Sequence, residues 1–398
     1  MQVLPKLCDA KKIAACGTYN VLPMYCEMLS DFTTPMETLR ILKNVSTHCY
    51  LLESARADET WGRYTFLGFD PKLELTCING EMKVGDLTFR TDQPSVYIRR
   101  VLDAYKSPRL EGLPPFTGGF VGYFSYDYVG YAEPCIKRTV QDTEQFKDVD
   151  LMLFDRVIAF DHVRQKIIFI VNIALNDIDT GYNHGMMQLR QLCDLIRNGK
   201  KKREDGGKIK GEITPLFDRK SFCEMVKKAK AHIREGDIFQ IVLSNRFSAP
   251  FSGSLLNTYR VLRTINPSPY MFYFSGTDVE VAGASPETLV KLENGVLSTF
   301  PLAGTKPRGK TPAEDEQRQQ QLLHDEKELA EHDMLVDLGR NDLGKISKFG
   351  TVRVEQLHQI ERFSHVMHIG STVRGEIRED CDALDAICLL YTSPSPRD

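Results

Sequence analysis

The chain has 398 residues, of which 42% are hydrophobic and 26% are charged, and its formal net charge at pH 7 is −3. This composition is typical of a globular protein, and the length allows two or more ordinary domains or one large interleaved fold. The nearly balanced charge gives no reason to expect a nucleic-acid partner, and no apolar run is long enough to span a membrane.

The N-terminus and the cysteines indicate the compartment. The first residues, MQVLPKLCDAKKIAACG, have scattered charges and no continuous apolar core, so they do not resemble a secretory signal. Ten cysteines are dispersed along the chain without a C-x-x-C pair. We therefore expect free thiols and a cytoplasmic protein.

In the first half of the chain, two stretches predict strands. The stretch GGFVGYFSYDYV (118–129) lacks the strand–loop–helix spacing of a nucleotide-binding loop, which favours a strand and a tight turn. The stretch LMLFDRVIAFDHVRQKIIFIVNI (151–173) predicts two strands joined by a polar turn around 163–165. Residues 198–211, NGKKKREDGGKIKG, combine glycine with a basic run and predict a solvated linker.

In the second half, capping residues mark where helices begin and end. Asp218 can cap a helix that ends at Gly236, and the following IFQIVLSNRF (238–247) predicts a strand. Thr311, with a proline next to it and a glutamate three residues on, is typical of a helix start. Strands and helices are mixed without regular alternation, so we expect an α+β or complex α/β fold with large, mostly antiparallel sheets.

An acidic helix follows at 325–346, DEKELAEHDMLVDLGRNDLGKI. Asp325 can cap it, and Glu328 and Glu331 fall three residues apart, so their carboxylates share one helical face. Carboxylate oxygens of this kind suit Mg²⁺, which keeps several waters and is shared with an anionic substrate. Spacing alone favours the simpler interpretation, a solvated acidic turn.

The acidic helix is not an isolated motif. It resembles the signature helix of chorismate-utilising enzymes, the family of anthranilate synthase large subunits, and further motifs of that family occur in the family's order. They are LLESA (51–55), GRYTFLGFDP (62–71), GGFVGYFSYD (118–127), EGDIFQIVLSNRF (235–247), INPSPYMFYF (265–274), GASPETLVKL (283–292), PLAGTKPRG (301–309) and FSHVMHIGSTVRGEI (363–377).

The resemblance implies two packed, mostly antiparallel β-sheets with helices outside. It implies an N-terminal region at 1–197 that carries part of a tryptophan site, the linker at 198–211, and a chorismate-binding catalytic region at 212–387. The implied activity is that of a Mg²⁺-dependent lyase, which converts chorismate and ammonia to anthranilate and pyruvate in the first step of tryptophan biosynthesis.

The same resemblance assigns roles to individual residues. Glu287, in the Ser-Pro-Glu motif, would protonate the leaving hydroxyl, and a desolvated cleft would raise its pKa. His368 would lie near the reacting ring. Gly304 and Thr305 would contact the substrate. Glu328 and Glu331 would hold Mg²⁺. A simpler role for Glu287, as a polar residue at a strand end, stays open from the residues alone.

Two positions distinguish related activities within the family. Isochorismate-forming relatives carry Lys at the position of Gln240, where water must be activated, and a neutral glutamine fits an enzyme that uses ammonia. Aminodeoxychorismate synthases commonly carry a nucleophilic Lys at the position of Ala303. Both residues favour anthranilate, with aminodeoxychorismate synthase component I as the alternative.

The resemblance also implies a pocket for tryptophan as feedback inhibitor, formed by Glu53, Ser54, Pro269, Tyr270 and Met271. A carboxylate and a hydroxyl suit the ammonium group of an amino acid, while proline and methionine suit an indole. The sequence shows no glutaminase nucleophile elbow, so we expect ammonia to come from a separate glutamine amidotransferase subunit.

The last eleven residues, CLLYTSPSPRD (388–398), do not resemble the family. They look like a translated sequencing adapter, so we expect the native residues to stop at Ile387 through incomplete assembly. The family continues beyond this point with a glycine-rich segment that is missing here, so we expect the chain as written to be inactive and poorly folded. The remaining alternative is a catalytically dead fragment that still binds tryptophan.

Overall fold

The computed structural model describes residues 2–55, 62–133 and 144–391. The chain divides into two units, one formed by 1–202 together with 262–398 and the other by 203–261. The first boundary lies inside the predicted linker. The second boundary returns the chain to the first unit, so this unit is built from both ends of the sequence.

A seven-stranded antiparallel sheet forms the base of the first unit. Its strands, in spatial order, are β1 (Val21–Leu29), β10 (Lys166–Ala174), β9 (Arg156–Asp161), β3 (Tyr64–Phe69), β2 (Cys49–Glu53), β15 (Tyr270–Ser275) and β16 (Glu280–Ser285). Met271 on β15 lies opposite Glu53 on β2. The sheet therefore joins the LLESA and SPYM motifs, which are more than 200 residues apart in the sequence.

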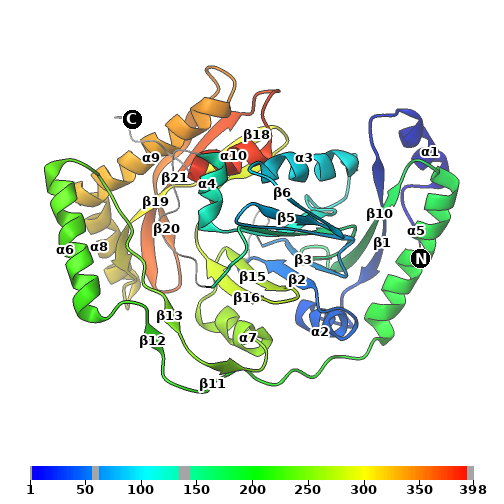
Figure 1. The fold of residues 1–398 in the computed structure, drawn as a ribbon, viewed down its shortest axis with the longest axis horizontal. Helices are drawn as coiled ribbons and strands as arrows, with labels where there is room; N and C mark the ends of the chain where they lie inside the picture. Colours follow the sequence, from blue (N-terminus) through cyan, green and yellow to red (C-terminus); the bar gives the residue numbers. More distant parts are fainter. Residues whose placement is uncertain (1, 56–61, 134–143, 392–398) are drawn as a thin grey trace. The chain divides into compact units, whose positions relative to one another are not determined.

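Helices pack on the seven-stranded sheet and shield its apolar side chains from water. Six of the nine residues of β10 are buried, five of them in a row at 167–171, and consecutive buried residues require cover on both faces of the strand. Helix α5 (Ile178–Asn198) packs on β10 with buried Leu189, Leu192 and Ile196 (Figure 1). Helix α1 (Leu7–Ala15) contacts α5, and α2 (Pro35–Val45) contacts β2 and β3.

A five-stranded antiparallel sheet packs against the first one. Its order is β6 (Leu87–Arg90), β5 (Glu81–Val84), β4 (Leu73–Ile78), β8 (Val149–Phe154) and β7 (Gly119–Phe124). Tyr50, Phe154 and Phe274 form a shared core, in which the Tyr50 and Phe154 rings meet edge to face at 4.7 Å. Another cluster joins Leu75 of β4 to helix α3 (Pro94–Ala104) and helix α10 (Ala383–Tyr391).

A third, five-stranded sheet carries most of the motifs that we predict to be catalytic. It has the order β17 (Lys291–Glu293), β18 (Val296–Thr299), β21 (Val366–Glu376) and β19 (Leu302–Pro307), and β20 (Arg353–Arg362) pairs with β21. Helix α9 (Glu326–Ile346) contacts β19 and β21, and α8 (Pro312–Leu323) contacts β19 (Figure 1). The predicted class, mostly antiparallel sheets with helices outside, is confirmed.

The second unit contains helix α6 (Arg219–Glu235) and two small sheets. Each sheet has two short strands: β11 (Lys208–Ile209) with β14 (Phe251–Ser252), and β12 (Thr214–Pro215) with β13 (Phe247–Ser248). Helix α7 (Leu256–Ile265) begins in this unit and ends in the first.

The predicted helix boundaries are confirmed because capping is local chemistry. Asp218 accepts a hydrogen bond from the backbone N–H of Ser221 at 2.7 Å, and Gly236 has the left-handed conformation with φ +81°. Thr311 caps α8, and Asp325 caps α9. None of the helices in the described ranges is long and apolar enough to cross a membrane.

Two strand predictions are wrong. Residues 238–246 form no strand, and only Phe247–Ser248 pair. A strand needs a neighbour for its ladder of hydrogen bonds, and none of the described strands pairs with this segment. The stretch 151–173 contains three strands, because the chain changes sheets between β8 and β9, although the turn around 163–165 is confirmed.

The predicted non-native tail begins inside a helix. Helix α10 continues through Ile387 and Cys388 and ends at Tyr391. Cys388 packs against the cluster around Leu75 and Leu384. The rest of the predicted tail, 392–398, lies outside the described residues.

An ion pair at the start of α8 leads to a test of stability against pH. The Arg308 guanidinium binds both oxygens of Asp315, at 2.8–3.0 Å, and the Gly309 N–H donates to the same carboxylate at 2.8 Å. The Arg308 guanidinium and the Gly309 N–H lower the pKa of Asp315 to about 2, from 3.8. Because the folded pKa lies below the unfolded one, the stabilisation is present above pH 3.8 and is lost as the pH falls through about 2.

We therefore expect Asp315→Asn to lower the free energy of unfolding at pH 7, and the difference from the wild type to shrink between pH 4 and pH 2. Urea titrations across this range measure it. Asp337→Asn is the matched control, because Asp337 pairs with Arg340 on the surface with both side chains more than half exposed. A difference that stays constant down to pH 2 would contradict the assignment.

Candidate functional site

The candidate site is built around a bulge in β19. The pairing of β19 with β21 shifts register between Ala303 and Thr305. Gly304, at the shift, has φ +70°, and a Cβ placed on it would lie 3.2–3.3 Å from side-chain atoms of Ile369, Leu322 and Glu328. The left-handed backbone conformation therefore favours glycine here, and a Cβ would in addition press against these three side chains.

The bulge fixes the orientation and the tautomer of His368. Thr305 lies opposite His368 across the β19–β21 pair. The Nδ1 atom of His368 is 2.9 Å from the carbonyl oxygen of Gly304 and 3.1 Å from Oγ1 of Thr305. Because a carbonyl oxygen only accepts, Nδ1 carries the proton, and Nε2 keeps a lone pair that can accept a proton.

The ring of His368 also has an aromatic neighbour. The Phe363 ring lies edge-on to the His368 ring, with 5.4 Å between the centroids. Glu361 on β20 lies opposite His368 on the other side of β21. Thr305, His368 and Glu361 therefore form one row across three neighbouring strands. His365, three residues before His368, lies in the turn between β20 and β21 and contacts Ser364.

Helix α9 brings a carboxylate to the same bulge. The backbone N–H of Thr305 donates to Oε2 of Glu328 at 3.3 Å. Glu331 lies one turn further along α9 on the same face and is half-buried. These are oxygen donors only, beside an exposed threonine, and this donor set fits a hard cation such as Mg²⁺.

Glu287 lies in the loop that follows β16. The hydroxyl of Ser285 accepts from the backbone N–H of Glu287 at 3.2 Å and also contacts its carbonyl oxygen at 3.3 Å, which makes the turn compact. The residue is exposed. The expectation that Glu287 lies in a desolvated cleft is therefore not met, since its loop extends past the end of the strand.

Gln240 lies in the second unit, in the segment that forms no strand, and it is exposed. Ala303, the other position that distinguishes related activities, is buried on β19. The site in the first unit thus contains Gly304, Thr305, His368 and Glu328, and Gln240 belongs to a different unit.

The five residues of the predicted tryptophan pocket line a single cavity of about 630 Å³ in the first unit. Its wall is mostly apolar and is formed by Leu52, Glu53, Ser54, Tyr64, Phe66, Val121, Gly122, Tyr123, Phe146, Pro269, Tyr270, Met271, Phe272, Phe274 and Val281. The size lies within the range of about 300–1,000 Å³ that is typical of small-molecule pockets. We refer to this cavity as the apolar pocket.

Glu53 in the apolar pocket has a partner that the sequence did not indicate. Arg263, near the end of α7, binds its carboxylate at 2.5 and 2.9 Å. The Glu53 side chain is only 7% exposed, so this charge is buried together with its counter-ion. A ligand ammonium group would have to share Glu53 with Arg263.

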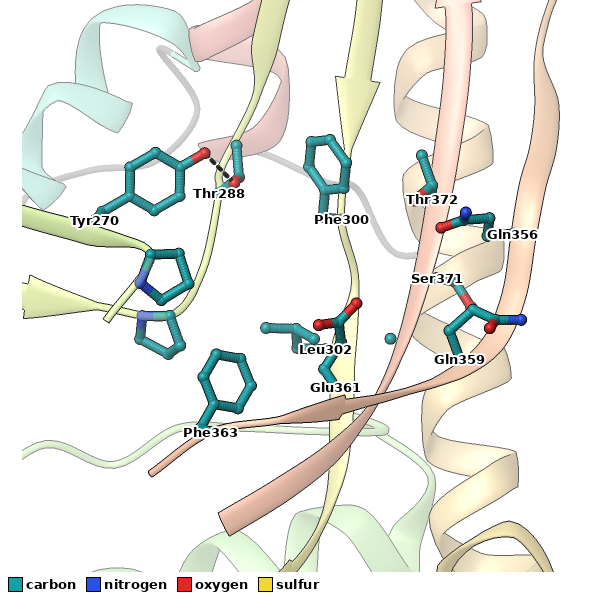
Figure 2. A pocket seen from close by; sticks show the side chains of 13 residues that line it. Tyr270, Thr288, Phe300, Leu302, Gln356, Gln359, Glu361, Phe363, Ser371 and Thr372 are labelled. Carbon is teal, nitrogen blue, oxygen red and sulfur yellow. Dashed lines mark hydrogen bonds between the residues drawn. The ribbon is translucent and has the colours of Figure 1, made fainter. Parts of the chain in front are cut away.

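A second, smaller cavity of about 120 Å³ lies beside the motifs that we predict to be catalytic, and we refer to it as the polar cavity. It is lined by Pro269, Tyr270, Pro286, Thr288, Phe300, Leu302, Gln356, Gln359, Glu361, Phe363, Gly370, Ser371 and Thr372. Figure 2 shows Tyr270 and Thr288 on one side of it and Gln356 and Gln359 on the other. The sequence did not indicate this cavity. The polar residues that β20 contributes to it, among them Gln356, Gln359 and Glu361, are the feature of the sequence that could have indicated it.

Comparison with known proteins identifies the family. Residues 47–396 match the model of the chorismate binding enzyme family. The chain belongs to this family. Anthranilate synthase component 1 from Acetivibrio thermocellus is 40% identical over 391 residues, which cover 95% of this chain and 78% of that protein. The same component from Aquifex aeolicus is 42% identical over 384 residues, which cover 93% and 76%.

Solved structures agree with the sequence relatives. Anthranilate synthase component I from Streptococcus pneumoniae superposes with a TM-score of 0.73 at 31% identity, covering 91% of this chain and 78% of that one. The menaquinone-specific isochorismate synthase from Escherichia coli superposes with a TM-score of 0.65 at 15% identity, covering 98% and 79%, and therefore shares the fold.

Proposed function

We propose that this chain is the large subunit of an anthranilate synthase. It converts chorismate and ammonia into anthranilate, pyruvate and water, the first step of tryptophan biosynthesis. The observation that carries the proposal is the bulge at Gly304, which brings His368, Thr305 and Glu328 together. The relatives that are about 40% identical over more than 90% of the chain support the same choice.

The proposed chemistry divides between an acid and a base. Ammonia adds to the ring and the ring hydroxyl leaves, and Glu287 donates the proton that turns hydroxide into water. The ring then becomes aromatic when pyruvate leaves and the carbon that bears nitrogen loses its proton. Nε2 of His368 has the free lone pair to accept that proton.

Glu328 and Glu331 would hold the magnesium ion. When bound, the ion neutralises negative charge on the substrate carboxylate. Gly304 provides the backbone conformation of the bulge. Thr305 provides a hydroxyl that is hydrogen-bonded to the imidazole of His368. The Lys327 ammonium lies 3.9 Å from Oε1 of Glu328, so a bound cation would compete with this exposed lysine for the carboxylate.

Two neutral side chains favour ammonia as the nucleophile that attacks the ring of chorismate. Gln240 cannot activate water as a base, and Ala303 cannot attack the ring. Gln240→Lys should add isochorismate to the products, and Ala303→Lys should shift them toward an aminodeoxychorismate-type product. Chromatography of the products measures both. Anthranilate as the sole product of both variants would remove the argument against aminodeoxychorismate synthase.

Tryptophan is proposed as the occupant of the apolar pocket and as feedback inhibitor. Support comes from the five predicted residues, which share one apolar cavity with a single buried carboxylate. Calorimetry should detect tryptophan binding, and Ser54→Ala should weaken it by about five-fold, the worth of one hydrogen bond. Equal affinity in both proteins would count against this site.

Ammonia is proposed to come from a separate glutamine amidotransferase subunit in the cytoplasm. Free ammonium should replace that subunit in the assay. The chain spans 76–78% of the length of the first relatives. Activity is measured on the full-length gene product.

A further inference from the structure

Tyr270 forms part of the wall between two cavities. Tyr270 lines both the apolar pocket and the polar cavity, together with Pro269. Its hydroxyl lies 2.5 Å from Oγ1 of Thr288 on the polar side (Figure 2). The residue therefore presents an apolar body to one cavity and a polar tip to the other.

Thr288 follows Glu287, the proposed acid, directly in the chain. The loop that carries both is bound to β15 at two places. Ser285, at the end of β16, lies opposite Tyr270 in the antiparallel pair and binds the backbone of Glu287. Thr288 binds the hydroxyl of the same Tyr270. Glu287 is held between these two attachments.

The geometry makes the loop sensitive to the position of the Tyr270 ring. A hydrogen bond between hydroxyls is made at about 2.5–3.0 Å, so a shift of the ring by roughly one ångström breaks it or pulls Thr288 along. A ligand that fills the apolar pocket packs directly against this ring. The first response releases Thr288 from β15 and the second displaces it, so both change how the backbone next to Glu287 is held.

We propose that the Tyr270–Thr288 hydrogen bond couples the apolar pocket to the loop that carries Glu287, with Thr288 as a positioning residue. The inference rests on the proposed function, because it needs an amino-acid ligand in one cavity and chorismate at the other site. Coupling is reciprocal, so each ligand changes the affinity for the other by the same factor.

The test measures the dissociation constant of tryptophan by calorimetry on the full-length gene product, with and without saturating chorismate and without ammonium. For the wild type, we expect the dissociation constant of tryptophan to differ by at least about five-fold between the two conditions, and we refer to this quotient as the coupling ratio. Thr288→Val should bring this ratio close to one while tryptophan still binds in the absence of chorismate. Thr288→Ser, which keeps the hydroxyl, should preserve the ratio.

Two further variants separate coupling from structure. Thr372→Val changes another threonine of the polar cavity and should keep the wild-type ratio. Tyr270→Phe removes the other hydroxyl, and the double variant with Thr288→Val should lose no more coupling than either single variant. If the hydrogen bond had a merely structural role, its loss would weaken the binding of both ligands and leave the coupling ratio unchanged.

The outcomes are distinguishable from failure of the proposed function. A wild-type ratio above five-fold that persists in Thr288→Val and in Tyr270→Phe overturns the inference and leaves the proposed activity untouched. A wild-type ratio of one, or no tryptophan binding, also overturns it. Failure of the activity itself shows separately, as absence of anthranilate from chorismate and ammonium.

Discussion

Replacing His368 by glutamine is expected to lower kcat for anthranilate formation by about 10²–10⁴-fold, the usual contribution of a positioned acid or base. The reason is the tautomer. Nδ1 is committed to the carbonyl oxygen of Gly304, so Nε2 is the atom that can accept the ring proton. Glutamine can occupy similar space, but its amide does not accept a proton at neutral pH. Initial rates from anthranilate fluorescence measure the effect.

The control for this variant is His365→Gln. His365 lies three residues away, is exposed and contacts Ser364 in the turn. Its replacement should change kcat by less than about two-fold, as for most exposed surface residues. Equal losses in the two variants would show that the turn between β20 and β21, and not the imidazole of His368, matters for the rate.

The second large effect is expected for Glu328→Gln, which should weaken the binding of Mg²⁺. The carboxylate lies at the bulge, within 3.3 Å of the backbone N–H of Thr305, and belongs to the proposed magnesium site. Removing its charge should raise the Mg²⁺ concentration for half-maximal activity by at least about 10–100-fold, the loss found even for residues that only support metal ligands. Magnesium titration of the initial rate measures it, and binding of Mg²⁺ followed by calorimetry provides a readout without turnover.

Glu326→Gln is the matched control for the magnesium prediction. Glu326 is the first residue of the same helix α9, is exposed and lies two positions from Glu328, on a different face of the helix. The magnesium dependence of this variant should match the wild type. An unchanged dependence in Glu328→Gln would exclude Glu328 as a ligand.

The sequence predicted those features that depend on local chemistry. Asp218, Thr311 and Asp325 each cap a helix because a short polar side chain can reach the backbone N–H three residues on. The acidic pair on α9 follows from helical periodicity. The antiparallel character of the sheets follows from the lack of regular alternation between strands and helices.

Features that depend on distant parts of the chain escaped prediction. Arg263 pairs with Glu53 from 210 positions away, and nothing near either residue indicates the other. The bulge at Gly304 arises from the register between β19 and β21, which the pattern of one strand does not determine. Residues 238–246 have strand-forming side chains but no neighbouring strand among those described, so propensity alone gave the wrong answer there.

The most direct test is the reaction of the full-length gene product with chorismate, ammonium and Mg²⁺. Products are separated by chromatography, with nitrogen-15 ammonium to follow the amino group. The proposed function predicts labelled anthranilate and an equal amount of pyruvate, with formation strongly reduced in the His368→Gln variant. Isochorismate, an aminated product that retains the pyruvyl group, or no turnover of chorismate by the wild type would contradict it.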